Sequence, residues 1–566
     1  MGGLDSLSAV PSNFLLFASG RKSCEEPADG QPIDLPLVMG LCYETGQDYG
    51  RVLCCANTTP FSFCISNARS VIILGMLFSE IRKQISDARV VNNVDAEITG
   101  IAYDSRNVRP GYIFIARKGG AFDSHEFIPR AIESGAVAIV AEREMDADID
   151  VPYVVVPDGR IAMGQAAAAF YDYPTRKMKL IGVTGTSGKT TTTHLIQAIF
   201  NASGMKAGLI GTLGARIGSE SIDTKHTTPE SLDLQRILAN MVEQGVRVVA
   251  MEVSSHGLYQ GRVMGCEFDC AVFANIARDH LDFHGTVEAY LDAKLMLFRN
   301  YPEMSNKEFV AVINADDPSS DKVRSVSNGK VITFGIDSPA DVGASNVVVT
   351  ENSVSFDMTY SGRTVPVKLG IGGSFNVYNA LSAAASALAM GLDIETIADG
   401  LATARSVPGR FESVECGQDF GVLVDYAHTP DELENVLKTA KALTENLLIA
   451  VFGCGGDRDK GKRPIMGGIG AELADIAVVT SDNSRTEDPN AIIDNILAGI
   501  GKDKMSHVNV QVDRKEAIRE ALTLARAGDL VVIAGKGHED YQIFADRTIH
   551  FDDREVAREI LSELVK

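Results

Sequence analysis

From Met76 to the C-terminus, the sequence alternates short apolar runs with stretches of helical spacing, and this alternation restricts the possible folds more than any other feature. Continuous apolar runs of about four to eight residues are typical of strands that are buried on both faces. A helix between two such strands supplies the long crossover that parallel pairing needs. The sequence therefore predicts an α/β protein built on parallel sheets.

The apolar runs fall into three series along the chain. The first comprises residues 111–116, 136–142 and 153–156, with a helix expected at 128–135. The second comprises residues 180–185, 206–211, 246–253, 269–276 and 309–314, and the third comprises 420–426, 446–453, 476–482 and 529–537. A basic, Pro-containing stretch at 171–179 and a break at 406–410 separate the series. Three domains are predicted, at 76–178, 179–406 and 407–566.

The first 75 residues differ from the rest of the chain. They hold five of the nine cysteines and show no sustained periodicity, and the first amphipathic helix is expected only at 77–85. The segment has no basic start followed by an apolar stretch, so we do not expect a secretory signal. Its several acidic residues argue against a transit peptide. We expect residues 1–75 to be a disordered or artefactual extension ahead of a start at Met76.

The balance of charge excludes some classes of partner. The formal net charge is −22, whereas nucleic acids and anionic membranes are bound by clustered lysine and arginine. No apolar run approaches the roughly 20 residues that span a bilayer. The cysteines form no paired metal-binding signature. We expect a cytoplasmic protein that binds neither nucleic acid nor membrane, although small anionic ligands remain compatible with this charge.

The sharpest local signal is the segment GTSGKTT at 185–191. It follows an apolar strand and precedes a helical run, which is the context of a phosphate-binding loop. Lys189 would reach the β- and γ-phosphates, and the hydroxyl of Thr190 would bind Mg²⁺. Position 183 is Val, so the strict GxxxxGK[ST] pattern is not met. The alternative is a glycine-rich turn with an exposed lysine.

Other polar residues follow neighbouring strands. Glu252 ends a predicted strand, where a carboxylate would face the crevice of a parallel sheet. It could complete a Mg²⁺ shell, or it could be an ordinary exposed residue at a strand end. His256 and His280 follow consecutive strands of the same predicted sheet. Lys294 lies on an apolar helical stripe, where a lysine ordinarily extends its charge to water.

Twelve separated motifs resemble the Mur ligase family, and within it the MurE type. They are YDSR (103–106), GTSGKTT (185–191), HTTPE (226–230), EVSSHGLYQGR (252–262), NIARDHLDFHG (275–285), the Lys294 helix, GSFNVYNALSA (373–383), PGRFE (408–412), DYAHTP (425–430), GCGGDRDKGKRP (453–464), DNSRTEDP (482–489) and GKGHEDYQ (535–542). Folylpolyglutamate synthases and the other Mur ligases share the ATPase core, but the pairing of the first motif with the last two separates the MurE type from both. The resemblance implies a uridine-nucleotide domain, a central P-loop ATPase and a C-terminal Rossmann-like domain.

The resemblance also implies roles for single residues. ATP would be bound by Gly185, Thr186, Ser187, Gly188, Lys189, Thr190, Thr191, Asn379, Arg410 and Asp425. The UDP-linked muramoyl dipeptide would be bound by Ser105, Thr227, Thr228, Ser254, Gln260 and Arg262. Metal ligands would be Thr190, Glu252, His280 and Lys294 as a CO₂-derived carbamate, and the catalytic set would be Lys189, Glu252, His280 and Lys294. An uncharged amine on a partly apolar face suits carbamylation, because desolvation lowers the pKa of a lysine.

The added amino acid would be recognised in the C-terminal domain. The implied contacts are Arg458, Asp482, Asn483, Ser484, Arg485, Gly535 and Glu539. Members that add meso-diaminopimelate carry a DNPR motif, and here the arginine is kept while Ser484 replaces the proline. The planar fork of Arg485 suits the distal carboxylate, so we favour diaminopimelate, with lysine as the alternative. Arg458 stands where a dinucleotide fingerprint needs glycine, which excludes NAD.

The implied activity is an ATP-dependent amide ligase of peptidoglycan synthesis. With Mg²⁺, it would join meso-diaminopimelate to UDP-N-acetylmuramoyl-L-alanyl-D-glutamate through an acyl phosphate. We expect a monomer. A catalytically silent scaffold would have lost part of the set Lys189, Glu252, His280 and Lys294, and all four are present.

Overall fold

The structure, a computed structural model, describes residues 51–54, 61–64, 75–119, 123–145 and 149–565. The chain divides into two compact units, Met1–Ile72 and Ile73–Lys566. In the first unit, β1 (Arg51–Cys54) pairs antiparallel with β2 (Phe61–Cys64). The rest of the predicted N-terminal extension lies outside the described residues, so that expectation stays a prediction.

The second unit begins with a five-stranded sheet in the order β4-β9-β8-β7-β6. Its parallel strands are β6 (Gly100–Ala102), β7 (Tyr112–Ile115), β8 (Ala136–Ala141) and β9 (Tyr153–Val155), and β4 (Arg89–Asn92) is antiparallel at one edge. β3 (Met76–Leu77) and β5 (Glu97–Ile98) form a separate pair. The helices are α1 (Phe78–Arg82), α2 (Ile128–Glu133) and α3 (Gly159–Phe170). Apolar side chains close one core on each face of the sheet.

An eleven-stranded sheet follows, in the order β13-β12-β11-β14-β10-β15-β16-β17-β18-β19-β20. Its strands are β10 (Lys179–Thr184), β11 (Ala207–Gly211), β12 (Gly214–Ile217), β13 (Glu220–Ile222), β14 (Val248–Glu252), β15 (Cys270–Phe273), β16 (Val310–Asn314), β17 (Lys330–Gly335), β18 (Val342–Val349), β19 (Val354–Tyr360) and β20 (Arg363–Leu369). Its helices are α4 (Lys189–Ala202), α5 (Ser231–Glu243), α6 (Ser255–Tyr259), α7 (Leu281–His284), α8 (Val287–Glu303), α9 (Ser320–Val326), α10 (Phe375–Ala389) and α11 (Ile394–Ala402). One core gathers α4, α10 and α11, and the other gathers α5 and α8.

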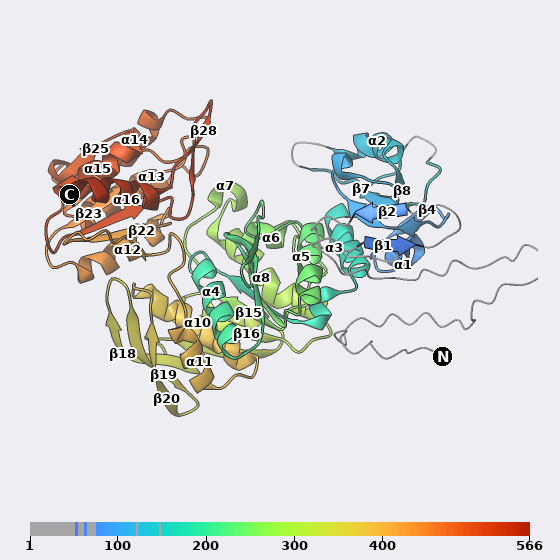
Figure 1. Ribbon diagram of the computed structural model, residues 1–566, viewed down its shortest axis with the longest axis horizontal. Coiled ribbons are helices and arrows are strands. Elements are labelled where there is room, and N and C mark those ends of the chain that lie inside the picture. The colour runs from blue at the N-terminus through green and yellow to red at the C-terminus, as the bar shows by residue number, and fades with distance from the viewer. Residues whose placement is uncertain (1–50, 55–60, 65–74, 120–122, 146–148, 566) are drawn as a thin grey trace, which may run out of the picture. The chain divides into compact units, whose positions relative to one another are not determined.

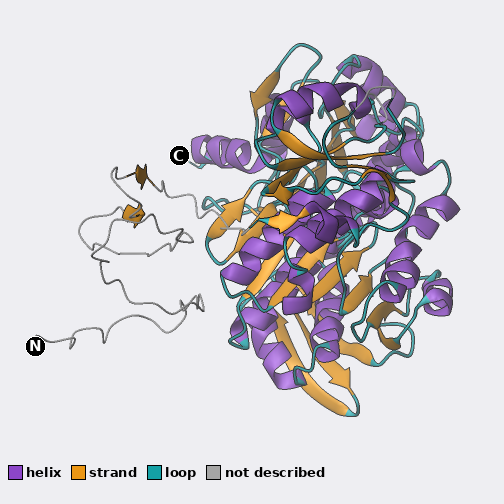
Figure 2. Cartoon of the chain, turned by 90° about the vertical axis from the view of Figure 1, so that its right-hand side faces the viewer, coloured by secondary structure: helices purple, strands orange, loops and turns teal. Residues whose placement is uncertain are grey.

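The last sheet has six strands in the order β21-β22-β26-β23-β24-β25. They are β21 (Glu412–Ser413), β22 (Gly421–Asp425), β23 (Leu448–Phe452), β24 (Ile476–Val479), β25 (Val508–Val510) and β26 (Leu530–Ala534), with a hairpin of β27 (Tyr541–Ile543) and β28 (Thr548–His550). The helices are α12 (Pro430–Leu443), α13 (Lys462–Leu473), α14 (Pro489–Leu497), α15 (Arg514–Leu524) and α16 (Asp553–Leu564). Helices pack on the strands of the five-, eleven- and six-stranded sheets (Figure 2). Each of these three sheets comes from one continuous stretch of chain (Figure 1).

The predicted α/β class with parallel sheets is confirmed. Every strand expected from an apolar run is present, with small differences at the ends. The run at 476–482 ends early as a strand, because β24 stops at Val479 and the remaining residues turn into a loop. The ribbon of β18, β19 and β20 was not expected. The apolar residues of β19 and β20 alternate with polar ones because one face of each strand is more exposed, and β18 is largely exposed after Val342, so none of the three forms a continuous buried apolar run.

The sheet topology determines where polar side chains meet. β10 lies between β14 and β15 and is parallel to both. Parallel neighbours end at the same edge, so the loop after β10, Glu252 at the end of β14 and Asn275 after β15 come together there.

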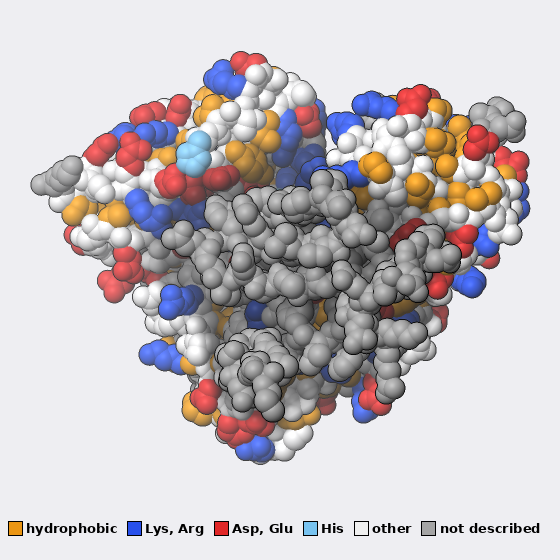
Figure 3. Space-filling view, turned by 45° about the vertical axis from the view of Figure 1, so that its right-hand side comes forward, with side chains coloured by type: hydrophobic (Ala, Val, Ile, Leu, Met, Phe, Trp, Pro, Cys, Tyr) orange, Lys and Arg blue, Asp and Glu red, His pale blue; other side chains and the backbone are white. Residues whose placement is uncertain are grey.

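Within the described residues, no helix is long and apolar enough to cross a membrane. Acidic and basic side chains are mixed on the face shown in Figure 3.

A fully buried ion pair holds the C-terminal sheet together. The Arg514 guanidinium donates to both carboxylate oxygens of Asp553, at 2.8 and 2.7 Å, and also to the carbonyl of Ala534 at 2.9 Å. Removing one partner would leave the other charge buried and unpaired. We expect Arg514→Met to lower the free energy of unfolding by about 3–5 kcal/mol in urea denaturation, and Arg514→Met/Asp553→Leu to lose much less. An equal loss in both variants would contradict this account.

Candidate active site

A cavity of about 990 Å³ lies where the carboxyl ends of the central strands meet residues of the C-terminal domain. The phosphate loop, Glu252, His280 and Lys294 all contribute to its wall. Arg410 and Asp425, which belong to the C-terminal domain, also line the cavity. The cavity therefore brings together the four predicted catalytic residues with most of the predicted ATP contacts.

The phosphate loop has the backbone that its glycines suggested. Gly188 has φ of +82° and directly precedes α4, and a side chain there would meet the Asn379 side chain 2.4 Å away. Only glycine satisfies both the left-handed backbone and the close approach. The first turn of α4 leaves backbone N–H groups without helical partners at the cavity, as an anion site requires.

Two lysine amines converge on one carbonyl of this loop. Lys189 Nζ donates to the Gly185 carbonyl at 2.9 Å, and Lys294 Nζ donates to the same oxygen at 2.7 Å. Lys294 is only 1% exposed and lies 4.3 Å from the ring centroid of Tyr290. Burial, reinforced by the charge of Lys189, holds the pKa of Lys294 far below its ordinary value. Lys294 therefore does not extend its charge to water, as a lysine on an apolar helical stripe ordinarily does. Its amine is buried and favours the neutral form.

The predicted metal ligands lie on this cavity. Glu252 is buried, and its carboxylate accepts from Thr212 through the backbone N–H at 2.8 Å and the hydroxyl at 3.1 Å. Burial lowers the pKa of His280 to about 4, so its ring is neutral at pH 7 and offers a lone pair. Within the described residues, no three His, Cys, Asp or Glu side chains form a ready-made metal centre. The Thr190 hydroxyl and the Glu252 carboxylate are oxygen donors of the kind that Mg²⁺ combines with substrate phosphates and water, whereas the His280 nitrogen is a less usual ligand for it.

Aromatic rings pack around His280. Its ring centroid is 4.7 Å from that of His256 and 5.8 Å from that of Tyr290. His284 lies on α7, and its Nε2 is 3.0 Å from the Ser255 hydroxyl. Burial lowers the pKa of both His256 and His284. The cluster packs against the half-buried ring of His280.

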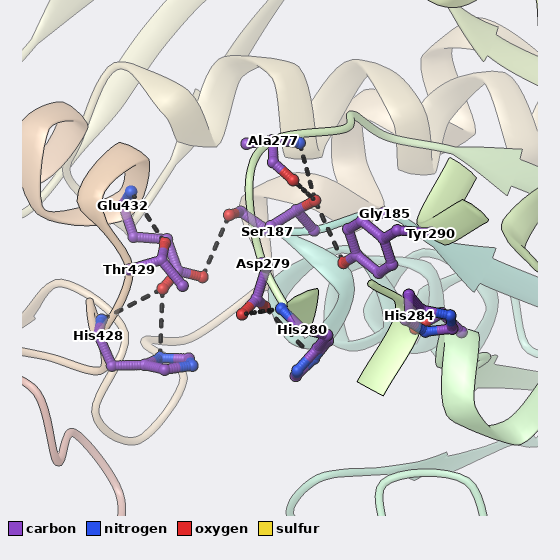
Figure 4. Close-up of polar contacts among 12 residues, drawn as sticks. Gly185, Ser187, Ala277, Asp279, His280, His284, Tyr290, His428, Thr429 and Glu432 are labelled. Carbon is purple, nitrogen blue, oxygen red and sulfur yellow. Dashed lines mark hydrogen bonds and ion pairs between the residues drawn. The ribbon is translucent and has the colours of Figure 1, made fainter. Parts of the chain in front are cut away.

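The C-terminal domain contacts the phosphate loop through Arg410, a predicted ATP residue, and through Glu432, which sequence analysis did not single out. Glu432, in the first turn of α12, accepts a hydrogen bond from the Ser187 hydroxyl at 3.1 Å, and His428 lies 3.2 Å from its other carboxylate oxygen (Figure 4). Arg410 donates to the Thr190 hydroxyl at 3.2 Å and lies over the ring of Tyr426. Glu432 is the second residue after the DYAHTP motif, and this closeness was the available signal.

Two further predicted ATP residues line the cavity in buried positions. Asp425 accepts hydrogen bonds from the backbone N–H groups of Phe411 and Ala427, each at 2.7 Å. Burial nevertheless raises the pKa of Asp425 to about 6. The Asn379 side chain donates to Asn376 at 2.7 Å, which orients its amide beside the phosphate loop.

Most of the residues predicted to bind the UDP-linked substrate surround the start of α6. The Thr228 hydroxyl donates to the Glu252 carbonyl at 2.9 Å and lies 3.1 Å from the Ser254 hydroxyl. Arg262 donates to the Thr228 carbonyl at 3.1 Å. Of the predicted set, Thr227 and Ser254 line the cavity, whereas Gln260 and Arg262 do not. Ser105 is buried in the N-terminal domain, in the 3₁₀ turn Ser105–Asn107.

The predicted amino-acid residues form a separate group at the ends of β24 and β26. The Asn483 side chain donates to Glu539 at 2.8 Å, and the Arg485 guanidinium donates to the carbonyl of Gly456 at 2.8 Å. Arg458 is exposed. Lys536, which sequence analysis missed, is fully buried and donates to Glu539 at 2.9 Å. The remaining members are Asp482, Ser484 and Gly535, and none of the seven predicted residues lines the cavity.

Comparison with known proteins shows which families and proteins this chain resembles. The Mur ligase catalytic domain matches residues 97–171, the Mur ligase middle domain matches 183–387, and the Mur ligase glutamate ligase domain matches 409–537. A UDP-N-acetylmuramoyl-L-alanyl-D-glutamate–2,6-diaminopimelate ligase from Geobacillus thermodenitrificans is 49% identical over 471 residues, covering 82% of this chain and 95% of that protein. The ligase of the same name from Bacillus cereus is 46% identical, covering 84% and 97%.

Solved structures agree in fold. A UDP-N-acetylmuramoyl-L-alanyl-D-glutamate–2,6-diaminopimelate ligase matches with a TM-score of 0.63 at 34% identity, covering 87% of this chain and 100% of that one. MurF from Acinetobacter baumannii matches with a TM-score of 0.60 at 20% identity, covering 82% and 96%, which supports the fold alone. Matching domains along the sequence, close relatives of nearly full length and a shared three-domain fold all agree: the chain belongs to the Mur ligase family.

Proposed function

We propose that this chain uses ATP to join meso-diaminopimelate to UDP-N-acetylmuramoyl-L-alanyl-D-glutamate, a step in peptidoglycan synthesis. One observation carries the proposal: a phosphate loop, Glu252, His280 and the buried amine of Lys294 line the same cavity. The relatives named for this reaction match over more than four-fifths of the chain, 82% in the Geobacillus case.

In the first step, a carboxylate oxygen of the D-glutamyl residue attacks the γ-phosphorus of ATP. The bond to the β–γ bridging oxygen breaks, and an acyl phosphate and ADP result. The α4 N-terminus and Lys189 hold the transferred group, and Lys189 exchanges its loop carbonyls for phosphate oxygens. Catalysis here consists of positioning and charge neutralisation, so no enzyme nucleophile is needed.

In the second step, the amine of diaminopimelate attacks the acyl carbon. The new C–N bond forms, inorganic phosphate leaves, and the nitrogen gives up a proton. Residues of both the central and the C-terminal domain line the cavity, so the reacting groups are enclosed from more than one side. Exclusion of water protects the acyl phosphate from hydrolysis.

Thr190, Glu252 and His280 would hold Mg²⁺, which when bound would neutralise phosphate charge. Lys294 would carry a carbamate: its neutral amine attacks the carbon of CO₂, a C–N bond forms, and a proton leaves to solvent. The burial that depresses the pKa of Lys294 keeps its lone pair available for this attack. The resulting carboxylate would place a negative charge beside Lys189, where a neutral amine stood before.

Arg485 would hold the distal carboxylate of diaminopimelate, and Glu539 would hold the distal ammonium group. Buried Lys536 occupies one oxygen of Glu539, so this part of the domain offers both positive and negative partners. A distal group carrying both charges matches it better than the single ammonium group of lysine.

We place the reaction in the cytoplasm, with the chain acting as a monomer. The complete catalytic set disfavours a silent scaffold.

Phosphate release tests the proposed function. Purified protein is incubated with UDP-N-acetylmuramoyl-L-alanyl-D-glutamate, ATP and Mg²⁺, together with either meso-diaminopimelate or lysine. We expect phosphate release with diaminopimelate and little with lysine. Activity with lysine alone would refute the amino-acid assignment, and no release with either would refute the ligase assignment.

Replacing Arg485 with alanine should impair use of diaminopimelate selectively. Loss of a bidentate carboxylate contact should lower kcat/KM for diaminopimelate about 100-fold and should leave KM for ATP nearly unchanged. Steady-state kinetics measures both quantities. Arg547→Ala, which removes an exposed arginine paired with Asp546, is the control and should behave as wild type. Unchanged use of diaminopimelate by Arg485→Ala would remove this contact from the proposal.

Nucleotide affinity should depend on the charge of Asp425. Its pKa of about 6 lies above the ordinary value, so the carboxylate becomes protonated as the pH falls through 6 and loses strength as an acceptor for the ribose hydroxyls. We expect the Kd for ADP, measured by calorimetry, to rise between pH 7 and pH 5. Titration of the nucleotide itself is common to wild type and Asp425→Asn, so the difference between them isolates this group. Parallel pH profiles would contradict the assignment.

A further inference from the structure

The phosphate loop is held by a side chain from the neighbouring strand end. Oδ1 of Asn275 accepts hydrogen bonds from the backbone N–H groups of Thr186 at 3.1 Å and Ser187 at 2.9 Å. Its Nδ2 donates to the Ser187 carbonyl at 3.3 Å, and its own carbonyl accepts from the Thr186 N–H at 3.1 Å. One asparagine thus engages both donors in the first half of the loop.

The segment that carries Asn275 is itself fixed. The carbonyl before it, on Ala274, accepts a hydrogen bond from the Asn314 side chain at 2.8 Å. The N–H after it, on Ile276, donates to the Asp317 carboxylate at 2.9 Å. Both partners belong to the end of the next strand, β16, and the turn after it. Asn275 is therefore presented to the loop from a rigid support.

Gly185 allows the loop to come this close. A side chain at Gly185 would lie 2.9 Å from the Ala274 side chain and 3.2 Å from the Asn275 backbone nitrogen. The Thr186 hydroxyl adds a second link, because it accepts from the Ala277 N–H at 2.9 Å. The loop and the segment leading to His280 thus form one hydrogen-bonded unit.

We propose that Asn275 is a positioning residue that completes the phosphate loop. The usual first glycine is absent because Val183 still lies in β10, paired with Glu252 and Val272. The loop lacks a longer glycine turn; instead, the Asn275 side chain accepts hydrogen bonds from the N–H groups of Thr186 and Ser187. Phosphate contacts then fall to the N–H groups at the start of α4, where the helix dipole adds its attraction. This inference rests on the proposed function, since it concerns how that reaction holds ATP.

Calorimetric titration with Mg·ADP tests this role without any turnover. In Asn275→Ala, the Ser187 N–H loses its acceptor and the Thr186 N–H keeps only the backbone carbonyl of residue 275. The loop is then held less firmly, so we expect the Kd for Mg·ADP to rise at least about tenfold. In turnover, KM for ATP should rise similarly while KM for diaminopimelate stays within about twofold of wild type. A general loss of structure would change both.

Two further variants sharpen the test. Asn328→Ala, which removes an asparagine bonded to the Arg299 carbonyl, is the matched control and should bind Mg·ADP normally. Asn275→Asp keeps the acceptor oxygens but adds a negative charge beside the loop, so binding should weaken at low salt and partly recover at high salt. Wild-type affinity in both Asn275 variants overturns the inference alone. Failure of the unaltered chain to bind Mg·ADP overturns the proposed function, and the inference with it.

Discussion

Replacing Lys294 with alanine is expected to lower kcat by about a thousandfold or more, because the variant loses the carbamate carboxylate that offsets phosphate charge in the cavity. KM for diaminopimelate should change little, since the amino-acid residues lie apart from this cavity. The lost side chain leaves space beside Gly185, so a short carboxylic acid such as acetate should restore part of the activity. Steady-state phosphate release measures both effects.

Two controls separate the carbamate from a general effect. Lys322→Ala removes an exposed lysine of α9 that pairs with Asp292 on α8, the helix that carries Lys294. This variant should retain wild-type activity. Carbon-13 bicarbonate should give a carbamate signal in the NMR spectrum of wild type and Lys322→Ala, but not in that of Lys294→Ala. Full activity of Lys294→Ala, or the same labelled signal in all three proteins, would remove the carbamate from the mechanism.

Replacing Lys189 with methionine is expected to lower kcat by about 100- to 1,000-fold while the protein stays folded. Methionine keeps the length and apolar character of the side chain but has no charge for the transferred phosphoryl group. In the ligand-free structure, Lys189 bonds only to carbonyls of its own loop, those of Gly185 at 2.9 Å and Thr186 at 2.7 Å, so its loss removes no contact between domains.

The control for Lys189 is an exposed lysine. Lys206→Met removes a side chain that donates to the Gln244 carbonyl, and it should leave kcat unchanged. Thermal unfolding should give similar midpoints for wild type and both variants. A Lys189→Met enzyme with wild-type kcat would show that the phosphoryl group is held by other groups.

The sequence was informative where local spacing decides structure. The glycine turn between strand and helix and the gathering of Glu252 and His280 at one sheet edge follow from the alternation of apolar strands and helices, whereas the order of the strands within the central sheet was not predicted. Lys294 was the exception among these residues. Its helical stripe favoured an exposed amine, and only the family resemblance, and then the buried contact with Gly185, indicated otherwise.

Long-range hydrogen bonds were beyond the sequence analysis. The contact of Asn275 with Ser187 spans 88 residues, and that of Ser187 with Glu432 spans 245. Both depend on the register of parallel strands or on the packing of two domains, neither of which a local pattern encodes. Lys536 was missed for a related reason: its burial comes from the folding of residues around Glu539 and Asn483.

The central claim is that this cavity transfers the γ-phosphoryl group of ATP to the D-glutamyl carboxylate. Transfer of oxygen-18 tests it most directly. The substrate is labelled at both carboxylate oxygens, the reaction is run with ATP and diaminopimelate, and the released phosphate is examined by phosphorus NMR. An acyl phosphate predicts one labelled oxygen in each phosphate and one retained in the amide. Phosphate without label would contradict the account.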